Sequence, residues 1–122
     1  MRGFYGEVIL DHYRFPRNRG KIARADFHAE EENDFCGDMV EVSGIVKKGK
    51  IKEIKFRGKG CVISQAAASL LTCYAAKKSA AQIKKMGAED MQKLLGINLS
   101  LTRLKCAELS LVTLKKALAL KK

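Results

Sequence analysis

Three cysteines and one aspartate stand where they could do metal or sulfur chemistry. Cys36 and Asp38 are separated by one glycine, so a thiol and a carboxylate can reach the same metal ion. Cys61 and Cys106 each lie near the expected beginning of a helix, where main-chain N–H groups favour a thiolate. Their spacings, from 36 to 61 and from 61 to 106, match no compact zinc-finger or ferredoxin pattern. Spacing alone therefore leaves open whether the three cysteines share one site.

Asp38 has two interpretations at this level. Its carboxylate can form an Asx-type turn, with Gly37 permitting the tight backbone. Alternatively, it completes a Cys3Asp ligand set with Cys36, Cys61 and Cys106. A carboxylate oxygen is a harder ligand than sulfur and holds a soft iron–sulfur centre less tightly, which suits a site that releases its contents.

The remaining cysteine and His12 are predicted to have no part in the chemistry. Cys73 follows Leu70 on the apolar stripe of an expected helix, and free cysteine is among the most buried residue types, so we place it in the core. His12 is expected to be a surface or packing residue, and neither it nor His28 is near a cysteine. Without a conspicuous Ser/His/Asp arrangement, hydrolytic chemistry has little support.

Length and composition indicate one domain over residues 1–122, with a modest core. No apolar run approaches the roughly 20 residues that a membrane span needs, and the first residues do not look like a secretion signal. We expect a cytoplasmic protein, in which structural disulfides are unlikely to form. The net charge is +11, but the lysines are spread along the chain and Trp is absent, so nucleic-acid binding is not favoured.

Hydrophobic periodicity predicts an α+β chain, with a small antiparallel sheet early and helices later, packed on it. Alternating apolar residues on either side of the "KKGK" segment at 47–50 predict a hairpin, and residues 25–31 are a weaker strand candidate. Three- and four-residue spacings predict helices over 3–13, 62–78, 79–86, 88–95 and about 103–120. Ser79 and Thr102 are the expected caps of the third and fifth helices, and Gly96 closes the fourth.

Four segments, in order along the chain, resemble the U-type iron–sulfur cluster assembly proteins: IscU, SufU and the N-terminal domain of NifU. The segments are "HYRFPRNRG" (12–20), "CGD" (36–38), "GKGCVISQAAAS" (58–69) and "RLKCAELSLVTLKKAL" (103–118). The resemblance implies a SufE/IscU-like fold, in which a small three-stranded antiparallel sheet packs against helices. It also implies that Cys36, Cys61 and Cys106 gather at one exposed edge with Asp38, as ligands of iron, zinc or a cluster and as sulfur acceptors.

Two features depart from the IscU pattern. IscU proteins have a histidine before the third cysteine, where this chain has Lys105. They also carry a Leu-Pro-Pro-Val-Lys chaperone-docking motif where this chain reads "LSLTR" (99–103), which argues against recognition by a dedicated Hsp70 chaperone. Lys105 could pair with Asp38, favour ionisation of a neighbouring thiol, or simply be solvated.

The resemblance supports two hypotheses. In the first, the chain is a non-enzymatic scaffold that takes sulfur from a cysteine desulfurase, builds a transient [2Fe–2S] or [4Fe–4S] cluster and passes it to apo-proteins, with zinc bound when no cluster is present. In the second, it is a SufU-like sulfurtransferase in which zinc orients a thiolate for persulfide transfer. The short stretch between Cys61 and Cys106 favours the scaffold, because the SufU branch carries an insertion there.

Overall fold

The computed structural model describes residues 6–33 and 37–121, and this part of the chain has the predicted α+β architecture. None of its helices is long and apolar enough to cross a membrane. The elements, in chain order, are α1 (Gly6–Arg14), β1 (Phe27–Asn33), β2 (Asp38–Lys47), β3 (Lys50–Lys59), α2 (Val62–Ala75), α3 (Ala80–Lys84), α4 (Ala88–Leu95) and α5 (Leu101–Ala119).

The three strands form an antiparallel sheet in the order β1-β2-β3, which confirms the predicted sheet. Lys48 and Gly49, with φ of +54° and +78°, turn the chain between β2 and β3. Two successive positive φ values are typical of the primed turns that match the twist of a hairpin. β1 begins at Phe27, two residues later than expected, because Asp26 instead binds the far end of β2, its carboxylate accepting the Val46 N–H.

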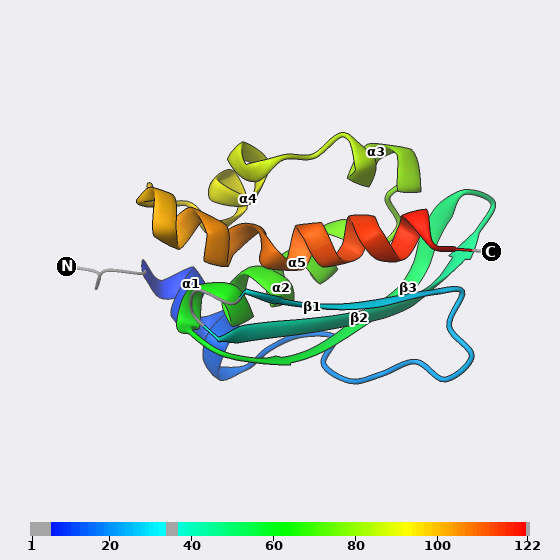
Figure 1. Ribbon diagram of the computed structural model, residues 1–122, viewed down its shortest axis with the longest axis horizontal. Coiled ribbons are helices and arrows are strands. Elements are labelled where there is room, and N and C mark those ends of the chain that lie inside the picture. Colours follow the sequence, from blue (N-terminus) through cyan, green and yellow to red (C-terminus); the bar gives the residue numbers. More distant parts are fainter. Residues whose placement is uncertain (1–5, 34–36, 122) are drawn as a thin grey trace.

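Helices cover one face of the sheet (Figure 1), with α2 and α5 in direct contact with the strands. Along each strand alternate side chains point to this face, and they bury a single apolar cluster against the two helices. Its largest fully buried members include Phe27, Phe56, Ile63, Leu71 and Leu114. The short helices α3 and α4 lie outside α2 and α5, and their caps are Ser79 and Gly96, as predicted.

The opposite face of the sheet is partly covered by the segment between α1 and β1 (Figure 1). Main-chain bonds from Gly20 N–H to Phe56 O and from Phe56 N–H to Asn18 O hold this segment along β3. Further on, the Ile22 N–H donates to the Ser43 hydroxyl. The segment is thus tied to two strands, and it brings its basic residues to this face.

His12 joins α1 to α2 from within the helical layer. Its Nδ1 lies 2.8 Å from the Ser69 hydroxyl, which also accepts the Arg17 N–H at 2.9 Å. Burial, and secondarily the charge of Arg17, lower the pKa of His12, so the neutral imidazole is the form that fits this contact. His12 is therefore a half-buried packing residue, in agreement with the sequence prediction.

Glu41 is the shared acceptor of several basic side chains on the outer face of the sheet, which is the face opposite the helices. Its carboxylate accepts from Arg57 Nε at 2.9 Å, lies 2.6 Å from His28 Nε2 and 3.6 Å from Lys21 Nζ, and its side chain is only 8% exposed. The hydrogen bond from His28 and the contacts with Arg57 lower the pKa of Glu41 from 4.5 to about 2, against the opposing effect of burial. The ionised carboxylate therefore ties all three strands and the covering segment together.

Glu41→Gln is expected to reduce the free energy of unfolding at pH 7 by about 2 kcal/mol, because it removes charge-assisted hydrogen bonds from a buried acceptor. A folded pKa of about 2 against 4.5 means that the contribution is complete above pH 4.5 and is lost as the pH falls toward 2. Urea unfolding at several pH values measures both effects. Glu30→Gln, an exposed carboxylate on β1 opposite Glu41, is the matched control; equal losses in the two variants would contradict the assignment.

Candidate metal and sulfur site

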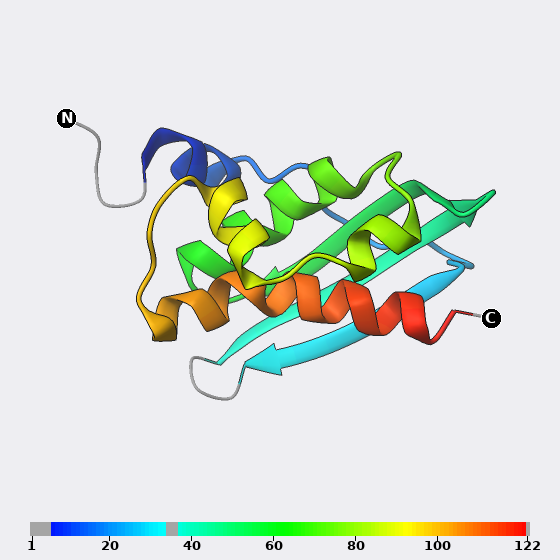
Figure 2. The same ribbon diagram turned by 90° about the horizontal axis from the view of Figure 1, so that it is seen from above.

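Three of the predicted site residues converge at one end of the sheet. Asp38 is the first residue of β2, Cys61 immediately precedes α2, and Cys106 lies in the second turn of α5. Figure 2 shows the beginning of β2, the beginning of α2 and the first half of α5 at this same end. One Asp38 carboxylate oxygen and the two sulfur atoms all lie within 4.8 Å of one another.

Cys61 is the N-cap of α2 and is hydrogen-bonded to Asp38. Its N–H donates to Asp38 Oδ1 at 2.8 Å, and its Sγ lies 3.5 Å from Asp38 Oδ2. The same sulfur accepts the Ser64 N–H at 3.4 Å, as a capping side chain does. The Cys61 sulfur therefore lies between a carboxylate oxygen of Asp38 and a main-chain N–H at the beginning of α2.

Gly60 makes this contact possible. Its φ is +135°, and a Cβ there would lie 2.1 Å from Asp38 Oδ1, far inside van der Waals contact. Any other residue would both strain the backbone and displace the carboxylate. The glycine before Cys61 is therefore required by the site, which is a role that the sequence analysis did not assign to it.

Cys106 approaches from the other helix and is only 1% exposed. The side-chain amide of Asn33, the last residue of β1, donates to its sulfur at 3.8 Å. The helix begins earlier than predicted, because Ser100 rather than Thr102 accepts the Arg103 N–H and caps it. Cys106 consequently lies two residues deeper in the helix than expected, and Asn33 is a neighbour that sequence reasoning missed.

Cys36 lies outside the described residues, so its position in the site remains a prediction. The residues that flank it are described: the Gly37 N–H donates to the Asn33 carbonyl at 2.8 Å. Asn33 also faces Asp38 in the strand register, which brings the ends of β1 and β2 together beside the site.

The chemistry of the three convergent side chains suits a soft or borderline cation. Two thiols and a carboxylate provide three of the four ligands of a tetrahedral zinc site. Asp38 is fully buried, and no basic side chain of the described residues bonds to it. A buried carboxylate is costly unless it is hydrogen-bonded, paired or coordinated, so a bound cation would supply the charge that the protein does not.

Lys105 does not supply that charge. It is exposed on α5, and among the described residues it forms no salt bridge with Asp38. Of the alternatives considered for Lys105, the geometry supports a solvated side chain next to a buried cysteine.

The prediction that Cys73 is a core residue is wrong. Cys73 is exposed, and Asn18 Nδ2 lies 3.8 Å from its sulfur. The buried stripe of α2 runs through Ile63, Ala67 and Leu71, and Cys73 is about 200° around the helix from Leu71. The apolar stripe predicted from the sequence is therefore rotated around α2 from the observed buried stripe by about one residue.

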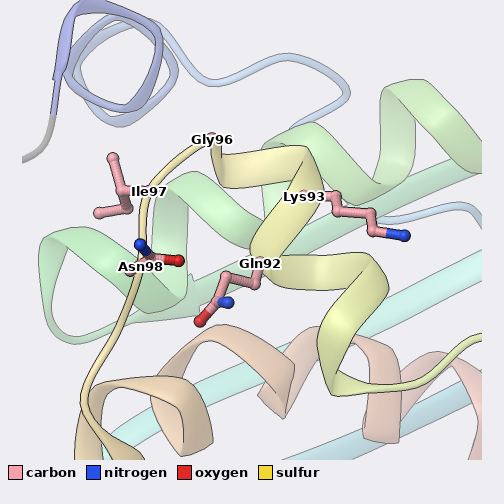
Figure 3. Close-up of a pocket in the computed structure, with 5 residues that line it drawn as sticks. All are labelled: Gln92, Lys93, Gly96, Ile97 and Asn98. Atoms are coloured by element: carbon pink, nitrogen blue, oxygen red, sulfur yellow. The ribbon is translucent and has the colours of Figure 1, made fainter.

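A cavity at the turn after α4 is not a second candidate site. It measures about 300 Å³ and is lined by Gln92, Lys93, Gly96, Ile97 and Asn98 (Figure 3). These residues offer no thiol, imidazole or carboxylate. Gln92 instead fixes the chain before α5, since its Oε1 accepts the Leu99 N–H.

Comparison with known families and proteins bears on this site. The family model of the NifU-like N-terminal domain matches residues 4–121. The iron–sulfur cluster assembly scaffold protein IscU 1 of Archaeoglobus fulgidus is 32% identical over 93% of this chain and 74% of its own length. The zinc-dependent sulfurtransferase SufU of Bacillus subtilis is 30% identical over 94% of this chain and 89% of its own.

Solved structures with the same fold include a putative iron–sulfur cluster assembly scaffold protein for the SUF system from Fervidobacterium islandicum. It is 31% identical and superimposes with a TM-score of 0.80, covering 93% of this chain and 96% of the other. The N-terminal part of a NifU-like protein from Brucella abortus reaches the same TM-score at 17% identity, which shows the fold alone.

Gly60→Ala is expected to destabilise the protein by about 3 kcal/mol through backbone strain and the clash with Asp38. The amide resonance of Cys61 should move at the same time, since its bond to Asp38 is lost. Gly87→Ala is the control, because Gly87 has an ordinary extended φ and open space around it. An unchanged Cys61 resonance in Gly60→Ala would contradict the predicted clash.

The accessibility of the thiols gives a second test. In the metal-free protein, Cys106 should react with a thiol reagent roughly tenfold more slowly than Cys73, because a buried sulfur reacts only after local opening. Cys73→Ala should remove a fast phase, and Cys106→Ala should remove the slow one. A slow phase that survives Cys106→Ala would show that another thiol is the protected one.

Proposed function

The chain belongs to the family of NifU-like N-terminal domains, and we propose that it is a carrier on which labile iron–sulfur clusters are assembled. In this proposal it accepts sulfur from a cysteine desulfurase, combines it with iron and passes the cluster to apo-proteins. The observation that supports it is the convergence of Asp38, Cys61 and Cys106 at one end of the sheet. Such thiols stay reduced in the cytoplasm, where we expect the protein to act.

Each site residue has a distinct part in this proposal. Cys61 and Cys106 are ligands and sulfur acceptors, and Cys36 adds the third thiol from the segment just before Asp38. Asp38 weakens the binding of iron at the site, because an oxygen ligand is harder than a fourth thiolate would be. The cluster is cargo, so a ligand set that binds it loosely favours transfer over storage.

Zinc fits the same residues when no cluster is present. Asp38, Cys61 and Cys106 would hold it, with Cys36 as the predicted fourth ligand, and zinc would keep the thiols deprotonated. The main chain positions these ligands. The Ser64 N–H orients the Cys61 sulfur, and Gly60 leaves room for the Asp38 carboxylate.

A zinc-dependent sulfurtransferase is the second candidate function. One specific observation favours it, namely the similarity along almost the whole chain to a relative of that name from Bacillus subtilis. In this alternative the chain is an enzyme that receives persulfide sulfur and passes it on, and no cluster forms on it. The same residues serve both functions, so the product distinguishes them.

Anaerobic reconstitution with iron, cysteine and a cysteine desulfurase tests the two candidates together. Visible absorption and bound zinc are followed in the same sample. We expect a labile chromophore that transfers to an apo-ferredoxin. Stoichiometric zinc without a chromophore, combined with strong stimulation of the desulfurase, would overturn the scaffold in favour of the sulfurtransferase.

Asp38→Ala should lengthen the lifetime of a reconstituted cluster, because the ligand that favours release is gone. The decay of visible absorption in the presence of a chelator measures this lifetime. Asp11→Ala, which removes an exposed carboxylate from α1, is the control. Circular dichroism checks the fold, since the variant also loses the acceptor of the Cys61 N–H. A lifetime equal to that of the unmodified protein would remove Asp38 from the site.

A further inference from the structure

A cavity of about 240 Å³ lies at the β3 edge of the sheet and reaches Gly60, the residue before Cys61. Its walls include Tyr13 near the end of α1, Pro16 and Arg19 from the segment that follows α1, and Lys59 and Gly60 at the end of β3. Gln65, one turn into α2, closes it. Cys61 itself does not line the cavity, so a molecule there would contact the residue that precedes the cysteine in the chain.

The cavity is positively charged. Arg19 and Lys59 are exposed, and none of the described residues that line the cavity is acidic. Lys55 lies on the outer face of β3 and packs against Gly20, beside Arg19. On this face Glu41 is already bonded to Arg57 and His28, and Glu53 lies toward the other end of β3. Arg19, Lys55 and Lys59 therefore form a cationic strip that leads to the cavity.

Gln65 forms the inner wall of the cavity. The residue is only 7% exposed, and its Nε2 donates to Ser64 Oγ at 3.1 Å and to Met39 O at 3.5 Å. Its Oε1 is fully buried against Gly58, another wall of the cavity, and has no hydrogen-bond partner among the described residues. Because that oxygen has no exposed surface, the groups that a partner can reach here are the charged side chains of Arg19 and Lys59.

We propose that this cavity and the cationic strip dock an acidic residue of the protein partner that exchanges sulfur at Cys61. An aspartate or glutamate side chain of a polypeptide offers the carboxylate that would pair with Arg19 and Lys59. A free amino acid offers a carboxylate too, but it makes no use of the strip that extends from the cavity to Lys55. The inference rests on the proposed function for the identity of the partner.

The test compares charge reversals on the two faces of the protein. Lys59→Glu and Arg19→Glu/Lys59→Glu change the proposed surface, and Lys84→Glu/Lys85→Glu changes the same number of charges on exposed lysines at the end of α3. We expect the affinity for a purified cysteine desulfurase to fall roughly tenfold in the double variant and less than twofold in the control. The loss should shrink at high salt, because exposed charges are screened.

Two further measurements separate docking from chemistry. Zinc binding, and the loading of Cys61 by sodium polysulfide, should be unchanged in Lys59→Glu, since neither needs a partner. If the unmodified protein binds the desulfurase in a Lys59-dependent way but accepts no sulfur, the proposed function fails and the docking surface stands. Equal losses in the α3 control and the double variant would overturn the docking surface.

The experiment also distinguishes two other occupants of the cavity, a free amino acid and a nucleic acid. Free glutamate is titrated while the side-chain amide resonances of Gln65 and the N–H of Gly60 are observed. Saturable shifts with free glutamate, together with unchanged desulfurase affinity in Lys59→Glu, would overturn the protein partner in favour of a small ligand. Binding of a single-stranded oligonucleotide that is lost in Lys59→Glu, with desulfurase affinity retained, would overturn it in favour of nucleic acid.

Discussion

The hydrogen bond between the Cys61 N–H and the Asp38 carboxylate is the interaction around which this end of the molecule is built. It joins the first residue of β2 to the N-cap of α2. It requires a glycine at position 60, and it fixes the Cys61 sulfur where the Ser64 N–H reaches it. The register of β2 and β3, in which Met39 faces Lys59, is what brings Asp38 to Gly60. A shift of one residue would turn Asp38 to the outer face of the sheet.

Burying that carboxylate is unfavourable by itself. Asp38 has a main-chain donor but no basic partner among the described side chains, whereas Glu41, three residues along the same strand, has three. The two acids show opposite solutions to the same desolvation cost. Glu41 is paired by side chains of the protein and stabilises the fold, while the described residues give Asp38 a main-chain donor and no basic side chain. Local conflicts of this kind are expected at functional sites.

Much of the fold could be predicted because the local signals agree with one another. The alternation through Val40 and Val42 and the turn at 47–50 gave the hairpin, and Ser79 and Gly96 marked two helix ends. Cys73 was misplaced because α2 is buried almost all round near its beginning, polar residues included, so its apolar periodicity does not fix which side is buried. Ser100 and Thr102 are both good caps, and only the structure shows that Ser100 accepts the Arg103 N–H.

The site itself was only partly predictable. Asp38, Cys61 and Cys106 were identified by residue type and by resemblance, but their convergence depends on how α5 packs across β1 and β2. No spacing in the sequence encodes that packing. Asn33 and Gly60 were missed for the same reason, since their contacts with Cys106 and Asp38 cross between elements.

The alternation of β3 links the sulfur site to the charged surface beside it. Lys55 and Lys59 point away from the helices, while Phe56 and Gly58 between them face the core side. The strand then ends, and the next two residues are the glycine and the cysteine of the site. Two of the lysines that look evenly spread in the sequence thereby share the outer face of the sheet, and the second of them is two residues before Cys61. One strand thus leads into Cys61 and also presents Lys55 and Lys59 on the outer face, so a change in its register would disturb both together.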